Sequence, residues 1–337
     1  MFRTSRGAAG AFAAILATPG AALGPAAAQQ QQDGAGVPWP SRPIRMVVPF
    51  PPGGGTDTLA RIVAQHLQGA FGQPVAVENR SGGSGVVGTE AVARAAPDGY
   101  TLAMTASGPL TILPQMMGPA APYDPLRSFA HVAIPSTTPL LMAVPAASPA
   151  RSAADFVDWA KREPGRLNRC SIGVASPSHL SGEMFGRAFG VRMEHVPHRG
   201  SAPALTDTVA ANCQALFDSA SSSAPLVRAG SLRALATTSA RRLDAFPEVP
   251  TLAGQGAAGF ETGTWSGVVA PAGTPAAIVG RLNAEIGRLA ATPGERRRVQ
   301  DQGGLPMDLS PAETAAFVQR EIEGWGRVIR AGGIRLD

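Results

Sequence analysis

The chain has 337 residues, of which 44% are apolar and 16% are charged, with a formal net charge of +5. This length and composition describe an ordinary globular protein that can bury a large core in one domain or two lobes. Nearly all of the positive charge is arginine, because Lys161 is the only lysine. The arginines are scattered, and the longest run, 296–298, has no interleaved aromatic residues. This pattern argues against a nucleic-acid partner and remains compatible with anionic small molecules.

The N-terminus predicts an export signal over residues 1–28. Arg3 and Arg6 precede the apolar stretch AGAFAAILATPGAAL, and the small-residue run GPAAAQQ offers a cleavage point near Ala28. A retained membrane anchor would need about 20 apolar residues, and this stretch is shorter and is broken by proline and glycine. We therefore expect a periplasmic protein.

Residues 29–40 predict a disordered leader, because QQQQDGAGVP is polar and contains glycine and proline. The only cysteines, Cys170 and Cys213, lie far beyond the cleavage point, so no lipid-bearing cysteine begins the mature chain. In an oxidising compartment they can form a disulfide if the strands they precede are neighbours. Two buried thiols are the alternative.

Apolar periodicity predicts strands alternating with helices, which is typical of a parallel sheet covered by helices. In the first part of the chain we expect strands at 44–50, 74–79 and 100–105 and helices after residue 55 and at 88–96. In the second part we expect strands at 140–145, 170–174, 193–197, 214–218 and 232–238 and helices at 152–162, 179–190 and 202–211. Residues 264–290 predict a further strand, turn and helix, and a terminal helix begins at Pro311.

The alternation restarts once along the chain, which predicts two α/β lobes. We expect lobe 1 to contain residues 41–138 and 241–337, and lobe 2 to contain residues 139–240.

Several motifs of enzymes and cofactor sites are incomplete. GSGVVG, 83–88, matches G-x-G-x-x-G after a strand, but the following strand ends TLAMTAS without the acid that binds ribose. PPGGGTD lacks the Lys-Ser/Thr pair of a P-loop, and no stretch spells G-x-S-x-G. His195 and His198 point to opposite faces of a strand, which argues against a metal site. We therefore expect no cofactor, no metal and no catalytic residue.

Two loops that lead from a strand into a helix remain as ligand candidates. The first is Phe50-Pro51-Pro52-Gly53-Gly54-Gly55-Thr56-Asp57, in which Thr56 or Asp57 can cap the helix. The second is 173–179, in which Ser176 is a favoured cap and Pro177 a favoured first helical residue. Glycines expose backbone N–H groups, and a helix N-terminus adds positive partial charge, so both loops suit a carboxylate. Either loop taken alone could equally serve only to turn the chain.

Several sequence blocks in fixed order resemble the Bug family of extracytoplasmic solute-binding receptors of the tripartite tricarboxylate transporter type. The resemblance covers residues 40–337. Its blocks are RPIRMVVPFPPGGGTDTLARIVAQHL, GQPVAVENRSGGSGVVGTEAVARAAPDGYTLAM, YDP at 123–125, HVPHRGSAPALTD, LRALATTSARR, FPEVPT and APAGTP.

The resemblance implies the two-lobe periplasmic-binding-protein fold of type II, in which lobes joined by crossover strands close on a ligand like a flytrap. It implies a small carboxylate as the ligand, membrane transporter subunits as partners, and a monomer. The ligand-binding residues it implies are Phe50, Pro51, Gly53, Gly54, Gly55, Thr56, Asp57, Thr105, Ser107, Ser176, Ser178, His179 and Asp218. Thr105, Ser107 and Trp265 are candidates for ligand selectivity.

The chain departs from the family pattern at Ala175, where glycine is common, and at His198, where HVPYKG would have tyrosine. These departures leave the identity of the ligand open. Two other functions also remain open: a sensor subunit that reports to a signalling protein, and an enzyme that uses the same cleft.

Overall fold

The computed structural model describes residues 39–335, and the chain from Trp39 onward forms one compact unit. The predicted export signal, 1–28, and residues 29–38 of the predicted leader lie outside the described residues. Among the helices of the described part, none is both long enough and apolar enough to cross a membrane.

The folded part begins at Trp39, within the predicted leader. The Trp39 ring lies 5.2 Å from the Phe71 ring, in an edge-on arrangement, and 6.3 Å from the Tyr100 ring. Pro40 is buried. The prediction that the disordered leader extends to residue 40 is therefore wrong at its last two positions, because Trp39 buries its ring against the core.

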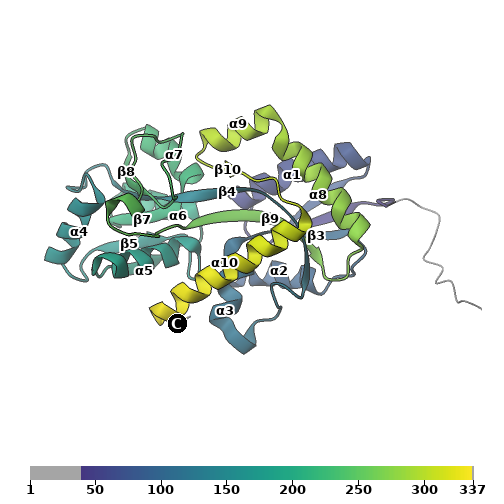
Figure 1. The fold of residues 1–337 in the computed structure, drawn as a ribbon, viewed down its shortest axis with the longest axis horizontal. Coiled ribbons are helices and arrows are strands. Elements are labelled where there is room, and N and C mark those ends of the chain that lie inside the picture. Colours follow the sequence, from purple (N-terminus) through teal and green to yellow (C-terminus); the bar gives the residue numbers. More distant parts are fainter. Residues whose placement is uncertain (1–38, 336–337) are drawn as a thin grey trace, which may run out of the picture. The chain divides into compact units, whose positions relative to one another are not determined.

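The strands form one sheet in the order β2-β1-β3-β9-β4-β7-β5-β6, with β8 and β10 also paired to β4 (Figure 1). Their bounds are β1 Ile44–Val48, β2 Val75–Asn79, β3 Thr101–Ala106, β4 Phe129–Pro145, β5 Asn168–Ser171, β6 Glu194–Pro197, β7 Ala215–Ser219, β8 Leu232–Thr237, β9 Gly263–Pro271 and β10 Leu305–Pro306.

The sheet is mixed, whereas the sequence predicts a parallel one. β1, β2 and β3 are parallel to one another, as are β5, β6 and β7, but β4 and β9 run antiparallel to their neighbours. β4 is 17 residues long and begins at Phe129, well before the predicted strand at 140–145. It pairs with β9 as far as Pro139 and with β7 from Leu140. β4 therefore belongs to both halves of the sheet, as a crossover strand does.

The helices are α1 Gly55–Phe71, α2 Val86–Ala93, α3 Leu113–Met117, α4 Ala153–Arg162, α5 Pro177–Phe189, α6 Ser201–Val209, α7 Ala220–Arg228, α8 Ala276–Ala291, α9 Pro293–Asp301 and α10 Pro311–Gly332. Short turns lie at η1 Gly83–Gly85, η2 Gly108–Ile112, η3 Gly118–Ala120 and η4 Ala253–Gln255. The sequence does not predict α3, α7 or α9. α7 contains an internal proline, Pro225, which is unfavourable in a helix. α9 buries none of its residues, so it has no apolar face that the sequence could reveal.

Both faces of the sheet are covered by helices. Along β1, Met46 belongs to the apolar cluster of α1 and α8, whereas Val47 belongs to the cluster of α2 and α10. In the other half, Phe217 of β7 packs with α4 and α5, and Leu216 packs with α6. Strands buried on both faces read as continuous apolar runs, which explains why IRMVV and ALF do not alternate with polar residues.

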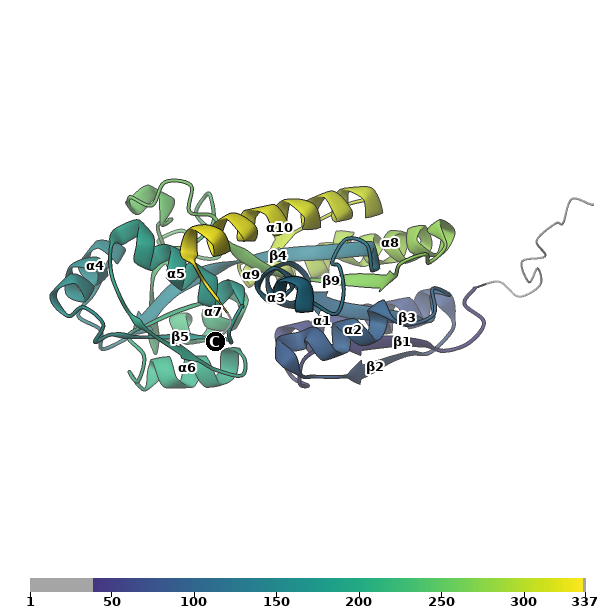
Figure 2. The same cartoon turned by 90° about the horizontal axis from the view of Figure 1, so that it is seen from below.

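The terminal helix α10 lies along β4, and its C-terminal end reaches α5 (Figure 2). There the guanidinium of Arg187 on α5 donates to the carbonyl oxygens of Ala331 and Gly332. α10 therefore contacts both halves of the sheet. The lobe boundaries at 138/139 and 240/241 stay predictions, although β4 passes from β9 to β7 at residues 139 and 140.

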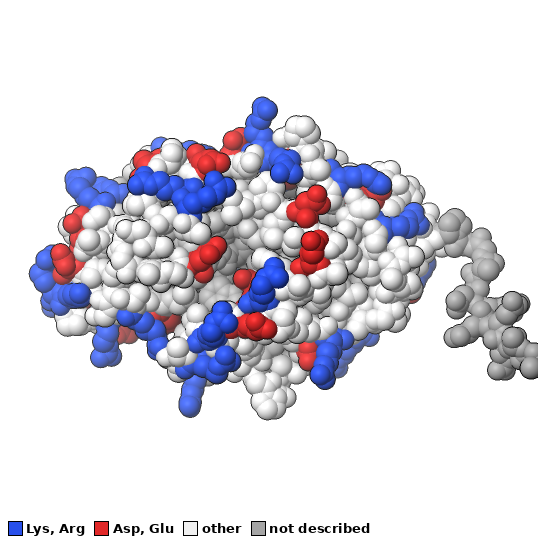
Figure 3. All heavy atoms as spheres, viewed as in Figure 1, with Lys and Arg blue, Asp and Glu red and all other residues white. Residues whose placement is uncertain are grey.

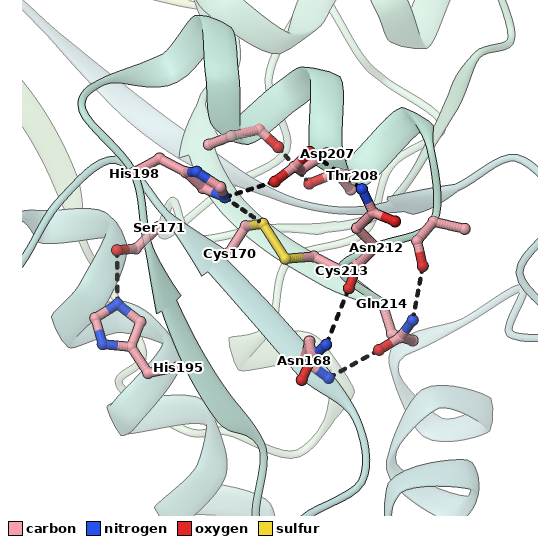
Figure 4. The surroundings of a disulfide bond; sticks show 12 residues. Asn168, Cys170, Ser171, His195, His198, Asp207, Thr208, Asn212, Cys213 and Gln214 are labelled. Atoms are coloured by element: carbon pink, nitrogen blue, oxygen red, sulfur yellow. Dashed lines mark hydrogen bonds and ion pairs between the residues drawn. A yellow bond between two sulfur atoms is a disulfide. The ribbon is translucent and has the colours of Figure 1, made fainter.

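Cys170 and Cys213 form a disulfide with an S–S distance of 2.02 Å (Figure 4). β5 and β7 are parallel neighbours with Cys170 opposite Leu216, so the cysteines meet at the start of adjacent strands. The His198 Nε2 atom lies 2.9 Å from the Cys170 sulfur and 3.4 Å from an Asp207 carboxylate oxygen. Of the two alternatives left open by the sequence, the structure has the disulfide.

The disulfide links residues 43 positions apart. Closing a loop of this length lowers the conformational entropy of the unfolded chain and so stabilises the folded protein by about 4 kcal/mol. We expect the Cys170→Ser, Cys213→Ser double variant to lose about 4 kcal/mol of unfolding free energy in urea. A reductant should lower the urea midpoint of the wild type but not that of the variant. Equal midpoints for both oxidised proteins would contradict this role.

Candidate ligand-binding site

The first loop leads from β1 into α1 and presents backbone donors. α1 begins at Gly55 with Gly54 as its N-cap residue, and no side chain caps it. The expected cap by Thr56 or Asp57 is therefore wrong. Among the described residues, the N–H groups of Gly54, Gly55 and Thr56 have no protein acceptor, and both glycines are exposed. These donors lie at the positive end of α1, which suits an anion.

Asp57 holds the first loop from beneath. One of its carboxylate oxygens accepts the Gly53 N–H at 2.9 Å, and the other accepts the Asn79 amide at 2.8 Å. Arg61 donates to both oxygens. Burial raises the pKa of Asp57, but these hydrogen bonds and the charge of Arg61 outweigh it and lower the pKa to about 2. Asp57 thus orders the loop and has no free oxygen for a ligand.

The second loop leads from β5 into α5 and has the predicted cap. The Ser176 hydroxyl accepts the His179 N–H at 3.1 Å and donates to the Gly173 carbonyl at 2.6 Å, and Pro177 begins the helix. Ser178 and His179 are buried under the loop, where the Ser178 hydroxyl accepts the Ile172 N–H. Of the predicted residues here, Ser176 is partly exposed and the other two support it from below.

The turn after β3 lies next to the second loop directly and next to the first loop through Gly85. A Cβ placed on Gly85 would lie 3.0 Å from Pro109 and 3.2 Å from the Phe50 ring of the first loop. A Cβ placed on Gly108 would lie 3.5 Å from the Ala175 carbonyl oxygen of the second loop. The Gly108–Pro109 turn therefore lies next to the second loop, and Gly85 lies between this turn and Phe50 of the first loop.

A row of hydroxyls on β9 joins these elements. Thr262, Thr264 and Ser266 occupy alternate positions of one strand and its lead-in, so they face the same side. Their hydroxyls lie 2.8 Å from Ser181 on α5, 3.3 Å from Ser107 after β3, and 2.9 Å from Thr56 on α1, respectively. The three β9 hydroxyls were not among the predicted site residues, although the alternation in TGTWS could have revealed them.

Trp265 faces the other side of β9. Its indole N–H donates to Glu321 of α10 at 3.0 Å, and its ring packs against Phe317. Thr105 is also turned away from solvent, because its fully buried hydroxyl lies 3.2 Å from that of Thr89 on α2. Of the three selectivity candidates, only Ser107 joins the row of hydroxyls.

Asp218 lies at the end of β7, fully buried. One carboxylate oxygen accepts the Ser201 hydroxyl at 2.9 Å, and the other has no donor among the described residues. Burial raises the pKa of Asp218 to about 6, and the hydrogen bond from Ser201 opposes this only in part.

The other motifs are structural. Gly88 has no space for a side chain, because a Cβ would lie 2.6 Å from the Arg80 carbonyl and 2.8 Å from Pro49. The described residues contain one group with metal-ligand geometry, Cys170, His198 and Cys213, but its sulfurs are joined in the disulfide. Figure 3 shows acidic and basic side chains interspersed around a hollow, so this face carries no uniform basic field for nucleic acid.

Comparisons with known proteins agree with this geometry. Residues 59–334 match the model of the tripartite tricarboxylate transporter family receptor. The chain is 36% identical to protein BugT of Bordetella pertussis over 88% of this chain and 91% of that protein. The chain belongs to this receptor family.

Two solved structures share its fold. Rhodopseudomonas palustris Rpa4515 with adipate has a TM-score of 0.83 and 35% identity, over 88% of this chain and 99% of that one. MatC from the same organism, with bound malate, has a TM-score of 0.79 and 32% identity, over 86% of this chain and 99% of that one. The predicted periplasmic-binding-protein fold is thereby confirmed.

We expect Asp57→Asn to lower the free energy of unfolding at pH 7, because it removes the ion pair with Arg61. The loss should be only about 1 kcal/mol, because Arg61 is half-exposed and solvent screens the pair. The folded-state pKa is depressed, so the stabilisation is present above pH 4 and is lost as the pH falls towards 2. Urea denaturation at pH 7 and at pH 2.5 measures this. Asp244→Asn, which changes the largely exposed pair of Asp244 with Arg241, is the control and should have no effect.

Asp218→Asn should have the opposite pH dependence. The folded-state pKa of Asp218 is raised above its unfolded value. The free energy of unfolding of the wild type therefore falls as the pH rises from 4 to 6, where the unfolded chain loses this proton more readily than the folded protein. We expect the variant to be more stable than the wild type at pH 8 by about 2 kcal/mol and equal to it near pH 4. Exposed Asp158→Asn is the control in the same urea titrations. A variant that is less stable than the wild type at pH 8 would mean that the ionised Asp218 carboxylate does not destabilise the folded protein.

Proposed function

We propose that this chain is a periplasmic receptor that captures a small organic acid for uptake by membrane transporter subunits. One carboxylate binds between the first loop, Phe50 to Asp57, and the second loop, 173–179. The observation that carries the proposal is that α1, whose first N–H groups have no acceptor among the described residues, and α5 both contact the row of hydroxyls along β9, through Thr56 and Ser181. Membership of the receptor family and the adipate and malate bound by its structural neighbours support an acidic ligand.

The binding step shifts an equilibrium between open and closed forms. The first loop belongs to lobe 1 and the second to lobe 2, so a carboxylate held by both loops stabilises the closed form. β4 and β9 run between the lobes and are the segments that bend. The closed monomer is the form that the transporter subunits bind, and the export signal cleaved near Ala28 delivers the chain to the periplasm.

A sensor subunit is the second candidate, because closure on a ligand can also be reported to a signalling protein. An enzyme is the third. The hydroxyl–imidazole pair beside the second loop, Ser171 and His195, does not support it, because the Ser171 hydroxyl is also bonded to the backbone of Gly173. The imidazole within the second loop, His179, already uses its Nδ1 atom to accept the Ala175 N–H.

A thermal-shift screen of mono-, di- and tricarboxylates tests the proposal, because a ligand that binds only the native state raises its melting temperature. We expect adipate, malate or a related acid to raise it and the corresponding amides to leave it unchanged. The ligand should be recovered unaltered after incubation. A shift with neutral compounds alone would contradict carboxylate capture, and conversion of the ligand would favour the enzyme.

A matched pair of variants tests the first loop. Gly55 is the first helical residue, where proline is tolerated, and Gly54 has the extended backbone that a following proline requires. Gly55→Pro removes one N–H, and Gly55→Ala keeps it. Because a hydrogen bond to a charged group contributes about 1.5–3 kcal/mol, we expect Gly55→Pro to weaken carboxylate affinity at least tenfold relative to Gly55→Ala in calorimetric titrations. Equal affinities would exclude this N–H as a ligand donor.

A further inference from the structure

The second loop contains a residue in an unfavourable conformation. Ala175 has φ +57°, in the left-handed region that alanine rarely adopts. It is 1% exposed and lies between Gly173 and the cap Ser176. A strained backbone at a binding loop persists only where its surroundings hold it.

The ring of His179 stabilises this conformation of Ala175. The Ala175 N–H donates to His179 Nδ1 at 3.3 Å, and the ring is 7% exposed. Because Nδ1 accepts, the ring proton of neutral His179 is on Nε2, which lies 3.8 Å from a Glu183 carboxylate oxygen. Burial, and then the charge of Arg169, lowers the pKa of His179 to about 4, so Nδ1 is free to accept at neutral pH.

His195 of β6 holds the other end of the loop. Its ring stacks on that of His179, with centroids 4.0 Å apart and planes inclined by 7°. His195 Nε2 lies 2.7 Å from the Ser171 hydroxyl (Figure 4). That hydroxyl donates to the Gly173 carbonyl and accepts the Gly173 N–H, so its three contacts link His195 to the start of the loop.

Arg169 fixes this pair from below. It is 1% exposed, donates to the His179 carbonyl at 3.1 Å and pairs with Glu183 at 2.6 Å. A Cβ on Gly182 would lie 2.3 Å from the guanidinium, so α5 can pass over Arg169 only with glycine there. The first two turns of α5 and the His179 ring are thereby held in one place.

We propose that His179, stacked on His195, is a positioning residue that holds Ala175 and Ser176 in the conformation that receives the ligand carboxylate. It acts on the ligand through the backbone of the loop and does not touch it. This inference rests on the proposed function for its ligand, but the bond from Ala175 to His179 can be tested without any ligand.

Two substitutions of equal size separate the acceptor from packing. In His179→Asn the amide oxygen can take the place of Nδ1, whereas His179→Leu fills the space without an acceptor. We expect His179→Leu to weaken adipate or malate binding at least tenfold and His179→Asn to remain within threefold of the wild type. His66→Asn, on α1 beside Glu285, is the control. Equal losses in the Asn and Leu variants, or no loss in either, would overturn the proposal.

The ligand-free measurement is hydrogen exchange of the Ala175 amide, followed by NMR. We expect slow exchange in the wild type and in His179→Asn, and fast exchange in His179→Leu while core amides of β7 stay protected. Fast exchange in the folded wild type would overturn the proposal. If slow exchange is found and no carboxylate binds, the positioning bond stands and the proposed function fails.

A double-variant cycle tests why the bond is needed. Ala175→Gly removes the strain, since glycine adopts φ +57° readily. We expect the affinity lost through His179→Leu to be at least threefold smaller in the Ala175→Gly background. The same loss in both backgrounds would mean that His179 does not act through the conformation of Ala175.

Discussion

The antiparallel pairing of β4 with β9 is the interaction on which the rest of the structure depends. β4 pairs with β9 along its first part and with β7 and β8 along its last part. This one strand therefore connects the set of parallel strands β1 to β3, through β9, with the set β5 to β7. β9 in turn pairs with β3 and carries the hydroxyls that contact α1 and α5. The contacts that α1 and α5 make with this one row of hydroxyls therefore depend on these two strands.

The charges around the two loops are compensated within the protein. Asp57 is paired with Arg61, Arg169 is paired with Glu183, and His179 is neutral at pH 7. The loops therefore present helix N-termini and hydroxyls instead of a fixed cation. Such donors stabilise an anion without the desolvation that a buried arginine or lysine would require. Asp218 is the exception, since one of its oxygens lacks a donor among the described residues.

The sequence predicts the local elements of this fold well, because local rules decide them. Ser176 and Pro177 begin α5 as predicted, since a cap and a first-turn proline act over three residues. The sequence does not predict the antiparallel course of β4, because PSTTP at 135–139 reads as a loop and the partner strand β9 lies more than 100 residues away in the chain. The side that Trp265 faces is not predictable either: periodicity gives two faces of a strand but does not say which one a distant helix such as α10 covers.

His179 and Asp57 illustrate a second limit. The sequence analysis names both as ligand-binding candidates, but in the structure their polar atoms bond to the candidate loops themselves. Whether a side chain contacts the ligand or supports the backbone that does so depends on a hydrogen-bond partner a few ångströms away, and motif spacing does not contain that information. Ala175 makes the distinction concrete. A glycine there would adopt the positive φ without strain. Alanine lowers the conformational entropy of the unfolded chain, which favours folding, but it is strained at this φ in the folded protein. The buried imidazole that accepts its N–H is what lets this loop use alanine.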